Sequence, residues 1–169
     1  HEVVGVDILT PYYDRAIKEI NLADVTASGA EVHLCDLAVD DIDHLMKGVD
    51  VVFHFAAQPG ISATTPFEDY VRNNIIATHR LLDSALMVPG LKGFVHISTS
   101  SIYGVHACGE ETVEVKPTSY YGVTKLAAEQ LALAYHREHG LPVVVLRLFS
   151  VYGPRERPEK LYHNLIKSI

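Results

Sequence analysis

The sequence predicts an α/β fold built on a doubly wound parallel sheet, and two observations carry this prediction. Short apolar runs rich in β-branched residues recur along the chain, and longer segments with helical spacing of apolar residues separate them. Runs of this kind, without alternation of polar and apolar residues, are typical of strands buried on both faces of a parallel sheet. The predicted strands span residues 3–6, 31–34, 51–54, 94–97 and 143–146.

Helices are predicted between the strands, over residues 14–22, 41–47, 67–87 and 120–139. In the third of these, apolar residues recur at roughly helical spacing until the pair Pro89-Gly90 ends the pattern. Gly140 and Pro142 end the fourth helix in the same way. Residues 161–169 have the pattern of the beginning of a further helix.

The composition argues against several classes of protein. A chain of 169 residues has the length of about one domain, and 48% hydrophobic with 21% charged residues is an ordinary globular balance. With 14 Lys and Arg against 21 Asp and Glu, the formal net charge is −7, so we expect no nucleic-acid partner. No apolar run reaches the ~20 residues of a membrane span and no signal peptide is recognisable, so we expect no membrane partner. Cys35 and Cys108 form no C-x-x-C pair and fit free thiols in a reducing cytoplasm.

The ten histidines do not predict a metal site. His136 and His139 lie three residues apart on a predicted helix, but no third ligand is within reach in the sequence. His33, His54 and His96 fall on predicted buried strands, where a hydrogen-bonded core imidazole is the default interpretation.

A tyrosine and a lysine near the start of the fourth helix form the strongest chemical signal. Tyr121 and Lys125 are four positions apart, so their side chains lie on one face of the helix, one turn from each other. A lysine ammonium favours the phenolate form of a neighbouring tyrosine, which lowers the tyrosine pKa from ~10 toward neutrality and makes the group a general base. Taken alone, the pair is equally compatible with a surface tyrosine followed by a surface lysine.

Residues that follow other strands support a catalytic interpretation, because ligands bind at the carboxyl edge of a parallel sheet. A run of hydroxyl side chains, 98–101, follows the fourth strand, where a hydroxyl can hydrogen-bond a substrate oxygen while Tyr121 removes its proton. The alternative is that these hydroxyls only cap the end of the strand. Ala56 and Ala57, after the third strand, are small enough to let the backbone approach a bound cofactor closely.

The first strand ends in Asp7, which favours NAD over NADP. A carboxylate at this place accepts hydrogen bonds from the adenosine ribose and repels a 2′-phosphate, although Asp7 can also be a simple turn residue. The Gly-rich turn that binds the pyrophosphate in such folds is missing, since Gly5 stands alone. We therefore expect the first βα unit to be absent and the 169 residues to be the middle of a longer protein.

The strand order of a doubly wound sheet makes this expectation concrete. In the order 3-2-1-4-5-6, residues 3–6 are strand 2 and residues 51–54 are strand 4, so the missing strand 1 is the central one. Its absence leaves two edges without hydrogen-bond partners, at a cost of ~1–3 kcal/mol for each unpaired buried group. We expect residues 1–169 alone neither to fold stably nor to bind NAD tightly.

Several segments in order give the chain a resemblance to the extended short-chain dehydrogenase/reductase family, in particular to the nucleotide-sugar epimerases and dehydratases. Residues 54–58 resemble the family's H-x-A-A segment, and residues 74–78 resemble its N-x-x-G-T segment with Ala77 in place of Gly. Residues 98–104 match S-[ST]-x-x-x-Y-G, Tyr121 and Lys125 match the catalytic pair, and residues 149–151 resemble the segment that lines the nicotinamide. The resemblance covers essentially all 169 residues and implies a partial NAD-binding, Rossmann-like domain whose residues from about 155 to 169 begin the substrate-binding part.

The resemblance implies roles for individual residues. The catalytic residues are Thr99, Tyr121 and Lys125. The cofactor-binding residues are Asp7, Asp36, Leu37, Phe55, Ala56, Ala57, Gln58, Asn74, Ser98, Tyr121, Lys125, Phe149 and Val151. The substrate-binding residues are Gln58, Thr99, Ser100, Ser150 and Arg157. For Asp36, the alternative is a role in capping the next helix together with Asp40 and Asp41.

Within this family the chain looks most like the UDP-glucuronate 4-epimerases. The shared segments are 12–14 with Lys18 and Glu19, 58–60, 121–129 and 151–158. Dehydratases typically carry Asp-Glu after the catalytic Thr, whereas Ser100 and Ser101 follow here and cannot act as general acid and base. The resemblance implies NAD-dependent C4 epimerisation of UDP-glucuronate through a 4-keto intermediate. A UDP-glucuronate decarboxylase, a UDP-galactose 4-epimerase and a non-catalytic NAD-binding interaction protein are the alternatives.

The resemblance also implies a homodimer formed through helices 67–87 and 120–139. Apolar residues cover more than one face of these helices, so that one face is free for a partner after the other packs on the sheet. These residues are Leu81, Leu82, Leu86, Leu126, Leu131 and Leu133.

Overall fold

The computed structural model describes residues 1–169 and divides into two compact units. One unit consists of His1–Asp36 and Ser150–Ile169, and the other of Leu37–Phe149. Each unit contains a parallel sheet, and none of the helices is long and apolar enough to cross a membrane.

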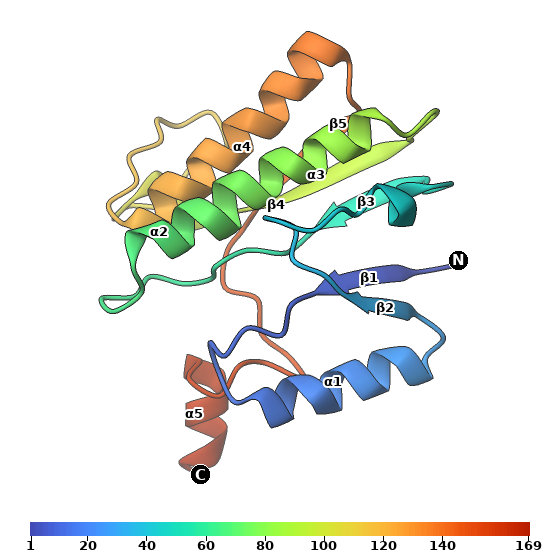
Figure 1. Cartoon of the computed structure of the whole chain (residues 1–169). Helices are drawn as coiled ribbons and strands as arrows, with labels where there is room; N and C mark the ends of the chain where they lie inside the picture. Colours follow the sequence, from blue (N-terminus) through green and yellow to red (C-terminus); the bar gives the residue numbers. More distant parts are fainter. The chain divides into compact units, whose positions relative to one another are not determined.

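The first unit contains a two-stranded sheet. Strand β1 (Val4–Asp7) pairs in parallel with β2 (Glu31–Leu34), and helix α1 (Arg15–Ala27) connects them (Figure 1). The Asp14 side chain caps α1 by accepting a hydrogen bond from the Ala16 N–H at 2.9 Å. Residues 150–169 belong to the same unit and end in α5 (Leu161–Lys167), which confirms the helix expected there.

The second unit contains a three-stranded sheet with the order β3-β4-β5. The strands β3 (Val51–His54), β4 (Gly93–Thr99) and β5 (Val143–Leu148) are all parallel. Helix α3 (Ala77–Leu86) and helix α4 (Tyr120–His139) lie side by side and cover this sheet (Figure 1).

The shorter elements depart from the predicted helices. A single 3₁₀ turn, η1 (Asp43–Met46), replaces the helix predicted over 41–47. The helix predicted over 67–87 begins with α2 (Phe67–Tyr70) and passes through a π-helical segment, η2 (Val71–Ile76), before α3. A second 3₁₀ turn, η3 (Ser100–Tyr103), follows β4 directly.

The strands of the second sheet are buried on one face only, which corrects the expectation of burial on both. Side chains that point toward α3 and α4, such as Val52 and Phe94, are buried. On the opposite face, Phe53 is 62% and Val144 53% exposed. The physical reason is that the helices packed on this sheet within the unit, α3 and α4, cover a single face.

The strand pairing agrees with the predicted order. β1 pairs only with β2, and β3 pairs only with β4, so the two sheets correspond to strands 3-2 and 4-5-6 of a doubly wound sheet. The α/β, Rossmann-like character of the chain is thereby confirmed.

Candidate active site

Tyr121 and Lys125 lie one turn apart in the first turns of α4. Ser119 caps this helix, since its hydroxyl accepts a hydrogen bond from the Gly122 N–H at 3.1 Å. Lys125 is 4% exposed and its ammonium donates a hydrogen bond to the Ile97 carbonyl on β4. The lysine therefore ties the helix to the strand that ends at Thr99.

Thr99 is the last residue of β4 and forms the start of the turn η3. Its hydroxyl accepts a hydrogen bond from the Ser101 N–H at 3.2 Å and donates one to the Ser101 hydroxyl at 3.3 Å. The Thr99 side chain is thus held in one orientation at the carboxyl edge of the sheet, where the sequence places the hydroxyl that assists Tyr121.

Gly122 allows α4 to touch this turn. A Cβ atom at position 122 would lie 2.6 Å from the Ser101 carbonyl oxygen and 3.0 Å from the Cβ atom of Pro117. Only a residue without a side chain permits this approach. Because Tyr121 precedes Gly122 and Thr99 lies two residues before Ser101, the glycine sets how closely Tyr121 and Thr99 can approach.

The charge of Lys125 depends on two opposing effects. Burial lowers the pKa of Lys125 from 10.5 to about 8, and the Glu129 carboxylate, one turn further along α4, opposes this shift. On the neighbouring strands, burial and then the Lys125 charge lower the pKa of His54 to about 3 and that of His96 to about 2. Both imidazoles are therefore neutral, and Lys125 is largely protonated at neutral pH.

The three histidines predicted on buried strands differ in burial and in hydrogen bonding. His54 is buried and its Nε2 atom hydrogen-bonds the Thr78 hydroxyl at 2.8 Å, as expected. His96 is fully buried, but neither ring nitrogen has a hydrogen-bond partner. His33 is half-buried and pairs with Glu31 at 2.8 Å, so it is not a core imidazole.

Asn74 joins the loop after β3 to α4. Its Oδ1 atom accepts a hydrogen bond from the Gln58 N–H at 2.7 Å, and its Nδ2 group donates to the Thr124 hydroxyl at 3.0 Å. Asn74 is 1% and the Gln58 side chain 7% exposed, so both belong to the packed framework behind the loop. Phe55 and Ala56, in the same loop, are exposed and can face a ligand.

The residues predicted to bind cofactor and substrate fall in both units. Leu37, 55–58, 98–100 and Phe149 belong to the second unit together with the three catalytic candidates. Asp7, Asp36, Ser150, Val151 and Arg157 belong to the first.

Within the first unit, the aromatic residues before α1 are paired with cations. Asp7 accepts a hydrogen bond from the Leu9 N–H at 2.6 Å. The Arg157 guanidinium lies 5.2 Å from the Tyr12 ring centre, and the Lys18 ammonium lies 4.5 Å from that of Tyr13.

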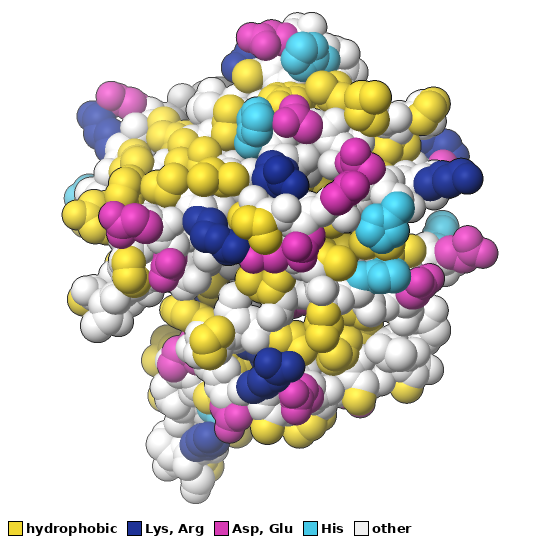
Figure 2. All heavy atoms as spheres, viewed as in Figure 1, with side chains coloured by type: hydrophobic (Ala, Val, Ile, Leu, Met, Phe, Trp, Pro, Cys, Tyr) yellow, Lys and Arg dark blue, Asp and Glu magenta, His cyan; other side chains and the backbone are white.

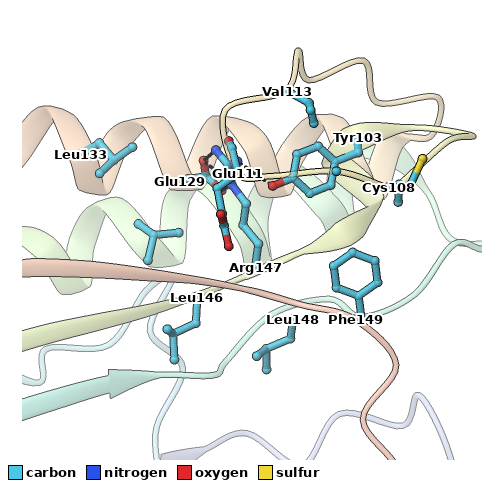
Figure 3. A pocket seen from close by; sticks show the side chains of 13 residues that line it. Tyr103, Cys108, Glu111, Val113, Glu129, Leu133, Leu146, Arg147, Leu148 and Phe149 are labelled. Atoms are coloured by element: carbon cyan, nitrogen blue, oxygen red, sulfur yellow. Dashed lines mark hydrogen bonds and ion pairs between the residues drawn. The ribbon is translucent and has the colours of Figure 1, made fainter.

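A pocket of about 420 Å³ lies beside β5 (Figure 3). Phe149 is the only predicted site residue that lines it, and Thr99, Tyr121 and Lys125 do not. Its wall contains Glu129 and Arg147, a buried ion pair that sequence patterns did not reveal. The signal that could have found it is the position of Glu129, one turn after Lys125 on the same helical face.

Comparison with known proteins identifies the family of the chain. The model of the NAD dependent epimerase/dehydratase family matches residues 1–169. The chain is 39% identical over 171 residues to an uncharacterized UDP-glucose epimerase of Bacillus subtilis (strain 168), covering 99% of this chain and 54% of that protein. It is 43% identical over 124 residues to a dTDP-glucose 4,6-dehydratase of Streptomyces antibioticus, covering 71% of this chain and 36% of that protein.

A solved structure gives the same result. UDP-glucuronic acid 4-epimerase from Bacillus cereus, in complex with UDP-glucuronic acid and NAD, has a TM-score of 0.89 and 38% identity over 99% of this chain and 54% of its own. The chain thus spans about half the length of the two Bacillus relatives. It belongs to the NAD-dependent epimerase/dehydratase family.

Proposed function

We propose that the complete protein carrying this chain is an NAD-dependent epimerase that inverts C4 of UDP-glucuronate through a 4-keto intermediate. The observation that carries the proposal is the contact of α4 with the turn after β4. It brings the helix turn with Tyr121 and Lys125 against the turn that Thr99 begins. The likeness to a UDP-glucuronic acid 4-epimerase supports the choice of substrate.

The residues present fit NAD. Exposed Phe55 and Ala56 after β3 and exposed Phe149 after β5 leave room for a flat ring and a close backbone approach. Asp7 offers an acceptor to a ribose, although one of its oxygens also binds the Leu9 N–H. When bound, NAD supplies the reversible oxidation of the sugar carbon.

The chain's own residues move and hold the proton. Tyr121, as phenolate, takes the proton of the C4 hydroxyl, and Lys125 stabilises the phenolate by its charge. The Thr99 hydroxyl proton, which points to the Ser101 hydroxyl in this structure, turns to donate a hydrogen bond to the reacting oxygen. When the keto sugar has turned its other face to the cofactor, Tyr121 returns the proton to that oxygen.

Residues near Thr99 argue for epimerisation rather than water loss. Dehydration of a keto sugar needs an acid and a base next to the reacting carbon, and Ser100 and Ser101 offer only hydroxyls. Among the predicted substrate residues, Arg157 has the charge that complements a uronate carboxylate.

The test compares two neighbouring tyrosines in the complete protein. Tyr121→Phe is expected to lower turnover of UDP-glucuronate by at least ~10²-fold, the scale of a positioned acid–base group. Tyr120→Phe is the matched control, because Tyr120 is 61% exposed and precedes the catalytic position by one residue. Product is measured as UDP-galacturonate by chromatography, and equal rates for Tyr121→Phe and wild type would contradict the proposed mechanism.

UDP-glucose is the second candidate substrate, because a Bacillus subtilis relative bears that name. Incubation with each nucleotide sugar separates the two candidates. Release of CO2 from UDP-glucuronate would identify a decarboxylase instead. Binding of NAD without turnover of any nucleotide sugar would favour a non-catalytic role.

We also propose a cytoplasmic homodimer that uses α3 and α4. Leu81 and Leu82 belong to the core, at 6% and 0% exposed, so they do not contribute to the outer face that the sequence predicts. Over α3 and α4, Figure 2 shows hydrophobic side chains next to acidic, basic and histidine side chains. A light-scattering mass equal to one chain at micromolar concentration would count against the dimer.

A further inference from the structure

We propose that Glu129, Arg147 and Ser98 form a positioning cluster that holds Thr99 and Lys125 in place for the reaction. This inference rests on the proposed function. Ser98 and Glu129 are buried and bonded to each other, and Arg147 bonds Glu129, so each of the three acts through a neighbour.

The cluster is a buried carboxylate with three donors. The Ser98 hydroxyl donates to Glu129 Oε2 at 2.6 Å. Arg147 donates through Nη2 to Oε1 at 2.7 Å, and through Nε to both carboxylate oxygens at 3.2 Å. Ser98 and Arg147 are paired in the β4–β5 register, so both side chains leave the sheet at the same level toward α4.

Arg147 extends the cluster to the turn after Thr99. Its Nη1 group donates to the Tyr103 hydroxyl at 2.8 Å and to the Glu111 carbonyl at 2.7 Å. Tyr103 is the last residue of η3. Figure 3 shows Arg147 reaching from β5 toward Glu129 on α4, with Tyr103 beside them.

The cluster continues the catalytic face of α4 by one turn. Lys125 binds the carbonyl of Ile97, and Glu129 binds the side chain of Ser98. Two successive helix turns are thus tied to two successive residues of β4, and Thr99 is the next residue. These two bonds fix the position of α4 along the direction of β4, and with it the position of Tyr121 relative to Thr99.

Stability alone does not account for such a pair. Glu129 is fully buried, and a buried ion pair contributes little compared with well-packed apolar residues of similar volume. A positioning role gives a reason for charged groups at this place, because the charge-assisted bonds fix direction as well as distance.

Glu129 also acts on Lys125 through its charge. The groups around Lys125 are neutral His54 on β3, neutral His96 on β4, Tyr121 on the same helix and Glu129 with its partner Arg147. Among these, Glu129 is the carboxylate whose charge favours the ammonium form of Lys125. Glu129→Gln leaves the effect of burial, which favours neutral Lys125, without the opposing carboxylate, so the pKa of Lys125 is expected to fall.

The experiment uses the complete protein and two readouts. The titration of Lys125 is followed by NMR on ¹³Cε-lysine-labelled protein without NAD, with the resonance assigned from Lys125→Met. The kcat for the proposed reaction is measured against pH in parallel. Glu138→Gln is the control, a glutamate on the same helix whose side chain is 72% exposed.

Glu129→Gln is expected to lower the titration midpoint of Lys125 by about 1–3 pH units and to move the alkaline fall of kcat to lower pH. Glu138→Gln is expected to leave both unchanged. A folded Glu129→Gln protein with the midpoint and pH profile of wild type overturns the inference. If the wild type turns over no nucleotide sugar, the proposed function fails, while the Lys125 titration still reports on the cluster.

Two milder variants keep the inference testable if Glu129→Gln does not fold. Ser98→Ala removes the hydrogen bond from the Ser98 hydroxyl to Glu129. Arg147→Lys keeps the positive charge but cannot donate to both carboxylate oxygens in the way that a guanidinium does. Each is expected to lower kcat by ~10-fold or more through misplacement of Thr99, with little change in KM and none in the Lys125 midpoint. Wild-type kcat in both variants overturns the positioning role.

Discussion

Gly122→Ala tests whether the contact between α4 and the turn after β4 sets the geometry of the site. The added Cβ atom would lie 2.6 Å from the Ser101 carbonyl oxygen and 3.0 Å from the Cβ atom of Pro117. Favourable separations of non-bonded heavy atoms are ~3.5–4.0 Å, so relief requires a movement of roughly 1 Å. Neither neighbour is the end of a flexible side chain, which means that the backbone must move.

Two effects on stability oppose each other in this variant. Overpacking costs ~1–3 kcal/mol, while replacing glycine by alanine in a helix contributes ~1 kcal/mol in the opposite direction. The free energy of unfolding is therefore expected to fall by up to ~2 kcal/mol. The effect on activity is larger, because a displacement of ~1 Å between catalytic groups can lower the rate ~10²-fold.

Gly93→Ala is the matched control for this substitution. At position 93 the nearest atom to an added Cβ would be a Val51 methyl at 3.5 Å, an ordinary contact. Urea denaturation gives the change in stability, and kcat on UDP-glucuronate gives the change in activity. If Gly122→Ala behaves like Gly93→Ala in both measurements, the close approach of α4 does not determine the site.

The remaining predictions concern the buried polar groups. Asn74→Ala leaves the Gln58 N–H without its hydrogen-bond partner and is expected to lower the free energy of unfolding by ~1–3 kcal/mol. The neighbouring Asn73→Ala is the control, and an equal loss of stability in both variants would contradict the prediction. The pKa of His54 is about 3 and that of His96 about 2 in the folded chain, against 6.5 in the unfolded chain. Between about pH 6.5 and 3 the unfolded chain therefore binds more protons than the folded chain. The free energy of unfolding falls as the pH falls through this range. His96→Phe should reduce the change of the free energy of unfolding with pH by up to ~1.4 kcal/mol per pH unit, measured by urea denaturation between pH 6.5 and 4.5. The control, His139→Gln at an exposed position, should show the same pH dependence of stability as wild type.

Local signals explain why some elements could be predicted from the sequence. Helix α4 has the predicted bounds because Ser119 caps its start and Gly140 ends it in the left-handed conformation at φ 72°. The spacing of Tyr121 and Lys125 places both on one face of this helix by geometry alone. Such features depend on neighbours in the chain.

Other features depend on tertiary contacts and could not be predicted. The π-helical segment η2 inserts extra backbone where the sequence shows only helical spacing, and buried Asn74 lies within it. The pairing of Glu129 on α4 with Arg147 on β5 requires the helix to pack on that strand, since the two residues lie 18 positions apart in the chain. The exposure of Phe53 likewise depends on which helices pack nearby.

The polar groups buried between α4 and the sheet follow one pattern, and the pattern explains where the chemistry is placed. Each of three side chains on α4 has a hydrogen-bond partner on another element. Thr124 bonds the Asn74 side chain, Lys125 the Ile97 carbonyl, and Glu129 the Ser98 hydroxyl. The bonds of Lys125 and Glu129 fix α4 against the end of β4, and the bond of Thr124 ties the same helix to Asn74 of η2. His96 lies further from this edge along β4 and has no hydrogen-bond partner. The hydrogen-bonded groups therefore concentrate where Tyr121 and Thr99 must be held at a fixed separation, and this is the part of the molecule in which substitutions should affect turnover more than stability.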